Sequence, residues 1–147
     1  VGELIRMSRP EDRFLHAAVS DVGDGSQKMF FASKSSTVSS LSYEHHKAWD
    51  GVSHNEVHEI PVDVFGINTI LERMGKTPDL LLVDAEGEDE KILSAVDYPK
   101  IIMVEMDHLD SSREHMISFM RRHGYIEYAT IKYNTIFAAE DVWNADR

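Results

Sequence analysis

The sequence predicts an α/β domain with a largely parallel sheet, and three observations support this prediction. The 147 residues are 42% hydrophobic and 28% charged, a composition typical of one compact domain, here residues 1–147. Short apolar runs alternate along the chain with stretches of helical periodicity. Two of the runs, LLLVD (80–84) and IIMVEMD (101–107), have the continuous apolar character of strands buried on both faces of a parallel sheet.

The N-terminal region contains two predicted strands, FLHAAVS (14–20) and KMFFAS (28–33). The segment VSDVGDGS between them has the Gly-x-Gly spacing of a nucleotide-binding loop. Such a loop is followed by a helix, whereas the serine-rich residues downstream are poor helix formers. We therefore interpret Asp24-Gly25 as a turn that joins two strands.

The serine-rich stretch from Ser33 to Ser42 has too little apolar surface to occupy a core, so we expect a loop there. Long loops in compact domains are often functional, and this one is predicted to be a mobile cover over a bound acceptor. After it, EVHEIPVDV (56–64) alternates between apolar and polar residues. Because Pro61 has no N–H to donate, this strand is predicted at a sheet edge.

The central and C-terminal regions have the clearest periodicity. Apolar residues from Ile67 to Met74 follow helical spacing, and Gly75 is expected to end that helix. Another helix is predicted to begin around Gly87, with acids in its first turn where they complement the helix dipole. A further helix is expected to end before Gly124, and two strands, YIEYATIKY and NTIFAAE, follow it.

Acidic residues follow both of the continuous apolar strands. Asp84 and Glu86 come after the first strand, and Glu105 and Asp107 come at the end of the second. Ligands of parallel α/β sheets bind at the carboxyl ends of the strands, so these four acids form the candidate site. Glu105 and Asp107 can be simply solvated acids at a strand end, or together with Asp84 they can hold Mg²⁺ through their oxygen atoms, which leaves the use of a metal open.

Composition argues against several classes of function. The formal net charge of −11 repels phosphate backbones and anionic membrane surfaces, so neither nucleic acid nor a membrane is an expected partner. The chain has no cysteine, which excludes disulfides and thiolate chemistry. It also has no apolar run of membrane-spanning length and no signal-peptide pattern at its start. These features predict a cytoplasmic protein.

Three segments together resemble a known family. LLLVDAEGEDEKIL contains D-x-E-G followed by a leucine at position 93, IIMVEMD follows it, and HAAVSDVGDG precedes it. A Ser-Ser-Leu stretch (39–41) and a Gly-Tyr pair (124–125) occur in the family's order. This arrangement, from about Arg13 to Ala139, resembles the FkbM-type class I methyltransferases, which use S-adenosylmethionine.

The resemblance implies a Rossmann-like, mostly parallel sheet and methyl transfer to a hydroxyl group of a sugar or small metabolite. It implies a catalytic role for Asp84, which would position the acceptor or cofactor, and for Glu86, which would accept the hydroxyl proton. It places Val19, Ser20 and Asp21 near the adenine of S-adenosylmethionine. The expected partner is a small-molecule acceptor.

The sequence departs from the family at its N-terminal side. In the family a glycine loop and a ribose-binding acid precede the A-A-V-S-D strand, and here only 16 residues precede Ala17. We therefore expect the chain to be the C-terminal portion of a methyltransferase-like domain, with the N-terminal strands missing. Those strands lie in the family between FLHAAVS and LLLVD, so these two should not be neighbours. An upstream segment or a homo-oligomer would then complete the sheet.

Other interpretations of the same residues remain open. In one of them, Asp84 has no catalytic role and is simply the N-terminal cap of the helix that follows it. The whole chain can be a non-catalytic binding or regulatory domain that has kept a methyltransferase-like fold without the cofactor loop. A metal-dependent hydrolase that uses the four acids is a third and weaker interpretation.

Overall fold

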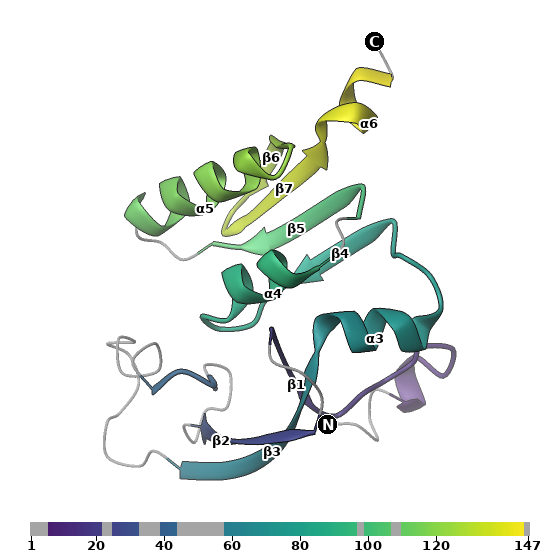
Figure 1. Ribbon diagram of the computed structural model, residues 1–147, viewed down its shortest axis with the longest axis vertical. Coiled ribbons are helices and arrows are strands. Elements are labelled where there is room, and N and C mark those ends of the chain that lie inside the picture. Colours follow the sequence, from purple (N-terminus) through teal and green to yellow (C-terminus); the bar gives the residue numbers. More distant parts are fainter. Residues whose placement is uncertain are drawn as a thin grey trace.

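The computed structural model describes residues 6–21, 25–32, 39–43, 58–96, 99–106 and 110–145, and it contains two small sheets (Figure 1). The first has the strand order β1-β3-β2, with β1 at Ala18–Ser20, β3 at His58–Gly66 and β2 at Ser26–Ala32. The second has the order β4-β5-β7-β6, comprising Leu80–Val83, Ile101–Glu105, Asn134–Ala139 and Tyr125–Ile131. As expected from the sequence, β1 and β4 are not neighbours.

Both sheets are mixed, which corrects the prediction of a mostly parallel sheet. The pairs β1–β3 and β4–β5 are parallel, but β2–β3, β5–β7 and β6–β7 are antiparallel. A two-residue connection at Lys132 and Tyr133 joins β6 to β7, and so short a connection permits only antiparallel pairing. The α/β class is therefore confirmed, while the parallel arrangement is limited to one pair in each sheet.

Of the predicted Asp24-Gly25 turn, Asp24 lies outside the described residues and Gly25 is a turn residue. Gly25 has a φ of +82°, a left-handed conformation that glycine adopts without strain, and a strand rather than a helix begins at Ser26. β1 and β2 do not pair with each other, because β3 lies between them. The nucleotide-loop interpretation of VSDVGDGS thus lacks the helix that it requires.

β3 is the central strand of the first sheet, so the prediction of an edge strand was wrong for its C-terminal part. There, Val64 to Gly66 pair with β1 on one side, and Val64 also lies opposite Ser26 of β2. From His58 to Asp63, the segment that contains Pro61, β3 pairs with β2 alone among the described residues. Pro61 therefore lies in a part of β3 where, among the described residues, only one side of the strand pairs with a neighbour. This explains why a proline is tolerated in a strand that is central to its sheet at the other end.

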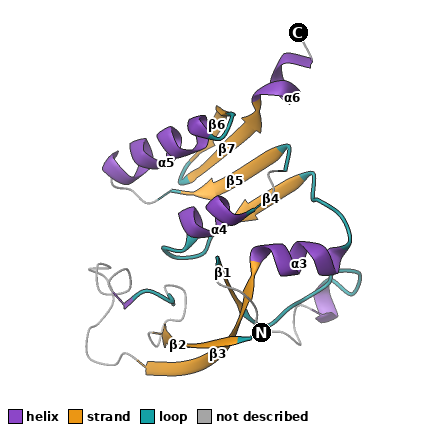
Figure 2. Cartoon of the chain, in the orientation of Figure 1, coloured by secondary structure: helices purple, strands orange, loops and turns teal. Residues whose placement is uncertain are grey.

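Four helices connect or follow the strands (Figure 2). α3 (Ile67–Met74) ends at Gly75 with a φ of +75°, which confirms the predicted helix and its end. α4 (Asp89–Ala95) begins two residues after the predicted start at Gly87. α5 (Asp110–Arg122) precedes β6, and α6 (Glu140–Ala145) follows β7. No helix in the described part of the chain is long and apolar enough to cross a membrane.

The core lies between one face of the second sheet and the helices α4 and α5. Its fully or almost fully buried members come from both layers: Val83, Ile92, Leu93, Ile102, Val104, Ile117, Met120, Tyr125 and Phe137. The opposite face is open. Leu80 and Leu82 of β4 are 55% and 56% exposed, so the prediction that this strand is buried on both faces was wrong. The helices α4 and α5 pack on the other face, and alternate residues of β4 therefore face solvent here.

Candidate functional site

The acids that follow β4 and end β5 lie side by side. β4 and β5 are parallel, and their register pairs Val83 with Val104, so the next residues along each strand, Asp84 and Glu105, are brought together. Asp84 acts on the Glu105 carboxyl group through its charge and a side-chain contact, so the two carboxyl groups lie close together. The sequence prediction that acids gather at this edge of the sheet is therefore met by these two residues, while Asp107 lies outside the described residues.

The contact changes the acidity of Glu105. Partial burial of its carboxyl group, and then the charge and hydrogen bond of Asp84, raise the pKa of Glu105 above its ordinary value of 4.5. The negative charges of Glu86 and Asp89 act in the same direction. A carboxyl group with a raised pKa is better matched to general acid–base catalysis than an ordinary one.

The D-x-E-G segment forms a tight turn between β4 and α4. Glu86 has a φ of +47° and Gly87 a φ of +96°, so two successive residues are left-handed. Asp89 holds the inside of the turn, because its Oδ1 accepts the N–H of Ala85 at 2.9 Å and its Oδ2 accepts the N–H of Gly87 at 3.3 Å. Asp89 was regarded from sequence only as a first-turn acid, and its spacing after D-x-E-G is the signal that could have revealed this role.

A residue from a distant segment reaches the same turn. The Ser40 hydroxyl donates to the carbonyl oxygen of Glu86 at 2.6 Å, and Ser40 is 1% exposed. Residues 33–38 of the predicted mobile cover lie outside the described residues. The described end of this predicted cover is held at the D-x-E-G turn by the Ser40 hydrogen bond.

The three predicted cofactor residues have different environments. Val19 is partly buried and packs against the core. Ser20 is fully buried, and its hydroxyl lies 3.0 Å from Oδ1 of Asp21 and 3.2 Å from Oε2 of Glu88. Asp21 is exposed. Only one of the three therefore presents its side chain to solvent.

Glu88 is a buried carboxylate that the sequence analysis did not single out. It is 2% exposed, and its Oε1 accepts a hydrogen bond from Nζ of Lys91 at 2.6 Å while Oε2 faces Ser20. Buried charges occur where such partners exist. Glu88 thus ties β1 of the first sheet to α4, which packs on the second.

No metal centre emerges from the part of the chain that is described. There, no three acidic or histidine side chains gather closely enough to hold an ion.

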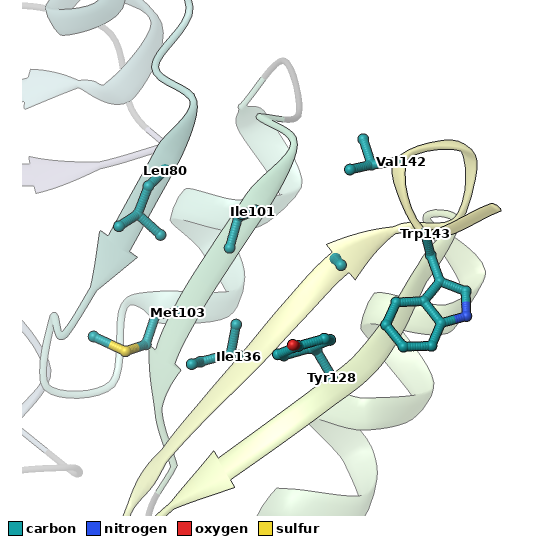
Figure 3. A pocket seen from close by; sticks show the side chains of 8 residues that line it. Leu80, Ile101, Met103, Tyr128, Ile136, Val142 and Trp143 are labelled. Carbon is teal, nitrogen blue, oxygen red and sulfur yellow. The ribbon is translucent and has the colours of Figure 1, made fainter. Parts of the chain in front are cut away.

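An apolar hollow of about 650 Å³ lies on the open face of the second sheet (Figure 3). Side chains from four strands and α6 line it: Leu80, Ile101, Met103, Tyr128, Ile136, Ala138, Val142 and Trp143. Met103 lies two residues before Glu105 on the same face of β5, so the hollow extends along this strand toward the acid pair.

Comparison with known proteins was made through family models, curated proteins and solved structures. The model described as the methyltransferase FkbM domain matches residues 6–127, which is most of the chain. The chain belongs to the FkbM methyltransferase family. No curated protein and no solved structure matched it. The match of the FkbM domain includes both the D-x-E-G turn and the strand β5.

Membership implies that this FkbM domain has a Rossmann-like fold and that S-adenosylmethionine is the methyl donor. The described residues fit that cofactor incompletely. Ser20 directs its hydroxyl toward Asp21 and Glu88, Val19 packs on the core, and Asp21 alone has an exposed side chain in the predicted adenine region. By contrast, the acid pair Asp84 and Glu105 and the turn beside it both lie within the described residues.

Proposed function

We propose that this FkbM domain takes part in O-methylation of a sugar or small-metabolite hydroxyl group. The observation that supports the proposal is the contact between Asp84 and Glu105 beside the D-x-E-G turn. A hydroxyl oxygen must lose its proton as it takes up a methyl group. Carboxylates held at the edge of a sheet, one with a raised pKa, are suited to receive that proton.

The bound cofactor supplies an electrophilic methyl group, and the residues of this chain orient the acceptor and remove its proton. In the proposal, Asp84 accepts a hydrogen bond from another polar hydrogen of the acceptor and thereby orients it. Glu86, two residues after Asp84 in a left-handed turn conformation, takes the proton of the reacting hydroxyl. Glu105 lies beside Asp84, and burial and the Asp84 charge raise the pKa of Glu105 there.

The test is methyl transfer from labelled S-adenosylmethionine to a panel of sugars and small hydroxyl metabolites. Asp84→Ala and Glu86→Ala are each expected to lower the rate by roughly 10²-fold or more, the usual effect of removing a positioned acid–base group. Glu90→Ala is the matched control, because Glu90 is an acid of the neighbouring helix α4 that pairs with His115 at the surface. Both variants reacting as fast as the control would refute the assignment.

A second candidate function is a non-catalytic binding or regulatory domain with this fold. It is favoured by the environment of Ser20, whose hydroxyl is directed to Glu88 rather than to a ligand. In this case S-adenosylmethionine binds weakly, with a dissociation constant of about 1 mM or more. Calorimetric titration separates the two candidates, since micromolar binding would argue for the enzyme.

A further inference from the structure

Ser40 makes two hydrogen bonds with one hydroxyl group. Its Oγ accepts the N–H of Ser42 at 2.9 Å, which closes a local turn, and its O–H donates to the Glu86 carbonyl at 2.6 Å. The two serines are neighbours in sequence, whereas Glu86 is 46 residues away. A buried hydroxyl that links a local turn to a distant one fixes both of them.

The Glu86 carbonyl belongs to a conformation that needs support. A residue with a Cβ atom is disfavoured in the left-handed region, and the following Gly87 is left-handed as well. Asp89 holds the amides of Ala85 and Gly87 from the α4 side. The Glu86 carbonyl points away from those contacts and is held by Ser40.

From this arrangement we infer that Ser40 is a positioning residue for the acids of the D-x-E-G turn. This inference rests on the proposed function, because it assigns Ser40 a part in the same reaction. Ser40 is buried and bonded to backbone, so it acts on the acceptor only through Glu86. Its hydroxyl keeps the Glu86 peptide oriented, and this in turn fixes the backbone from which the Glu86 side chain extends.

The first experiment is a double-mutant cycle with steady-state kinetics. Ser40→Ala is expected to lower kcat roughly tenfold, the usual effect of losing one buried hydrogen bond, with KM changed less than about twofold. In a Glu86→Ala background, Ser40→Ala is expected to lower kcat no further, because Ser40 acts through that side chain. Ser94→Ala is the control, since that hydroxyl bonds only to Lys91 of its own helix among the interactions in the structure.

Losses in kcat that multiply in the double variant would overturn the inference, and so would a change confined to KM. If Ser40→Ala does not fold, Ser40→Cys replaces it, because the thiol has similar size but donates weakly, and the same loss of kcat is expected. Full activity of Ser40→Cys would then be the contradicting result.

A second measurement separates failure of this inference from failure of the proposed function. Amide hydrogen exchange at Gly87 is expected to become roughly tenfold faster in Ser40→Ala and to stay unchanged in Ser94→Ala, because only the first releases the turn. Full activity of both Asp84→Ala and Glu86→Ala would refute the proposed function, whereas faster exchange at Gly87 in Ser40→Ala would still show that Ser40 holds the turn. Unchanged exchange at Gly87 in Ser40→Ala would refute the positioning role of Ser40, whatever the reaction is.

Discussion

Replacing Ser20 with alanine tests whether its hydroxyl belongs to the fold or to the cofactor site. The hydroxyl has one proton for two carboxylate acceptors, Asp21 Oδ1 at 3.0 Å and Glu88 Oε2 at 3.2 Å. A hydrogen bond to a charged group contributes roughly 1.5–3 kcal/mol, and sharing one proton over long distances places this contact at or below the lower limit. We therefore expect Ser20→Ala to lower the free energy of unfolding by about 1–1.5 kcal/mol.

Urea unfolding of the purified protein without cofactor, followed by circular dichroism, measures this change. Ser94→Ala is the matched control, because it also removes a serine hydroxyl but from an exposed helical position, where an effect within about 0.5 kcal/mol is expected. Equal stability of the two variants would refute the reasoning. It would leave the Ser20 hydroxyl free for the role near the adenine that the family resemblance implies.

Two further predictions concern the acid pair and the open face. The pKa of Glu105 is raised in the folded state, so ionising this group costs folding free energy as pH rises through the folded pKa. Glu105→Gln should therefore leave the free energy of unfolding unchanged below pH 4.5 and increase it progressively at higher pH. Urea unfolding at a series of pH values measures this, and an increase confined to low pH would contradict the prediction. Ile102→Ala should lower the free energy of unfolding by about 2–5 kcal/mol and Leu82→Ala by less than about 1 kcal/mol, because Ile102 is fully buried and Leu82 is 56% exposed. The same urea unfolding measures both, and comparable losses in the two variants would show that the open face is covered in solution.

The features that the sequence predicted correctly depend on local patterns. Helical spacing from Ile67 to Met74 and the glycine after it were sufficient to locate α3 and its end. Apolar runs located β4 and β5, and the rule that ligands bind at the carboxyl ends of parallel strands selected Asp84 and Glu105, which do lie in contact.

The features that could not be predicted depend on contacts between distant segments. Apolar character shows that Leu80 and Leu82 can be buried, but whether another layer covers them is not recorded in their own sequence. The bond from Ser40 to Glu86 spans 46 residues, and the one from Ser20 to Glu88 spans 68. Serine is common in loops, so neither residue stands out until the fold brings its partner near.

The separation of the two sheets has a consequence for the candidate site. No strand pairing joins β1 to β4 among the described residues, so backbone ladders do not fix the position of one sheet relative to the other. The polar contacts that help to do so are the Ser20–Glu88 pair and the bond from Asn68 of α3 to the Ala95 carbonyl of α4, together with the packing of Val19 and Ile67 on the core. Val19 to Asp21 and the D-x-E-G turn are the two halves of the predicted site. Of these contacts, the Ser20–Glu88 pair is the one that joins the two halves directly, so loss of Glu88 should disturb their relative placement more than it destabilises either sheet.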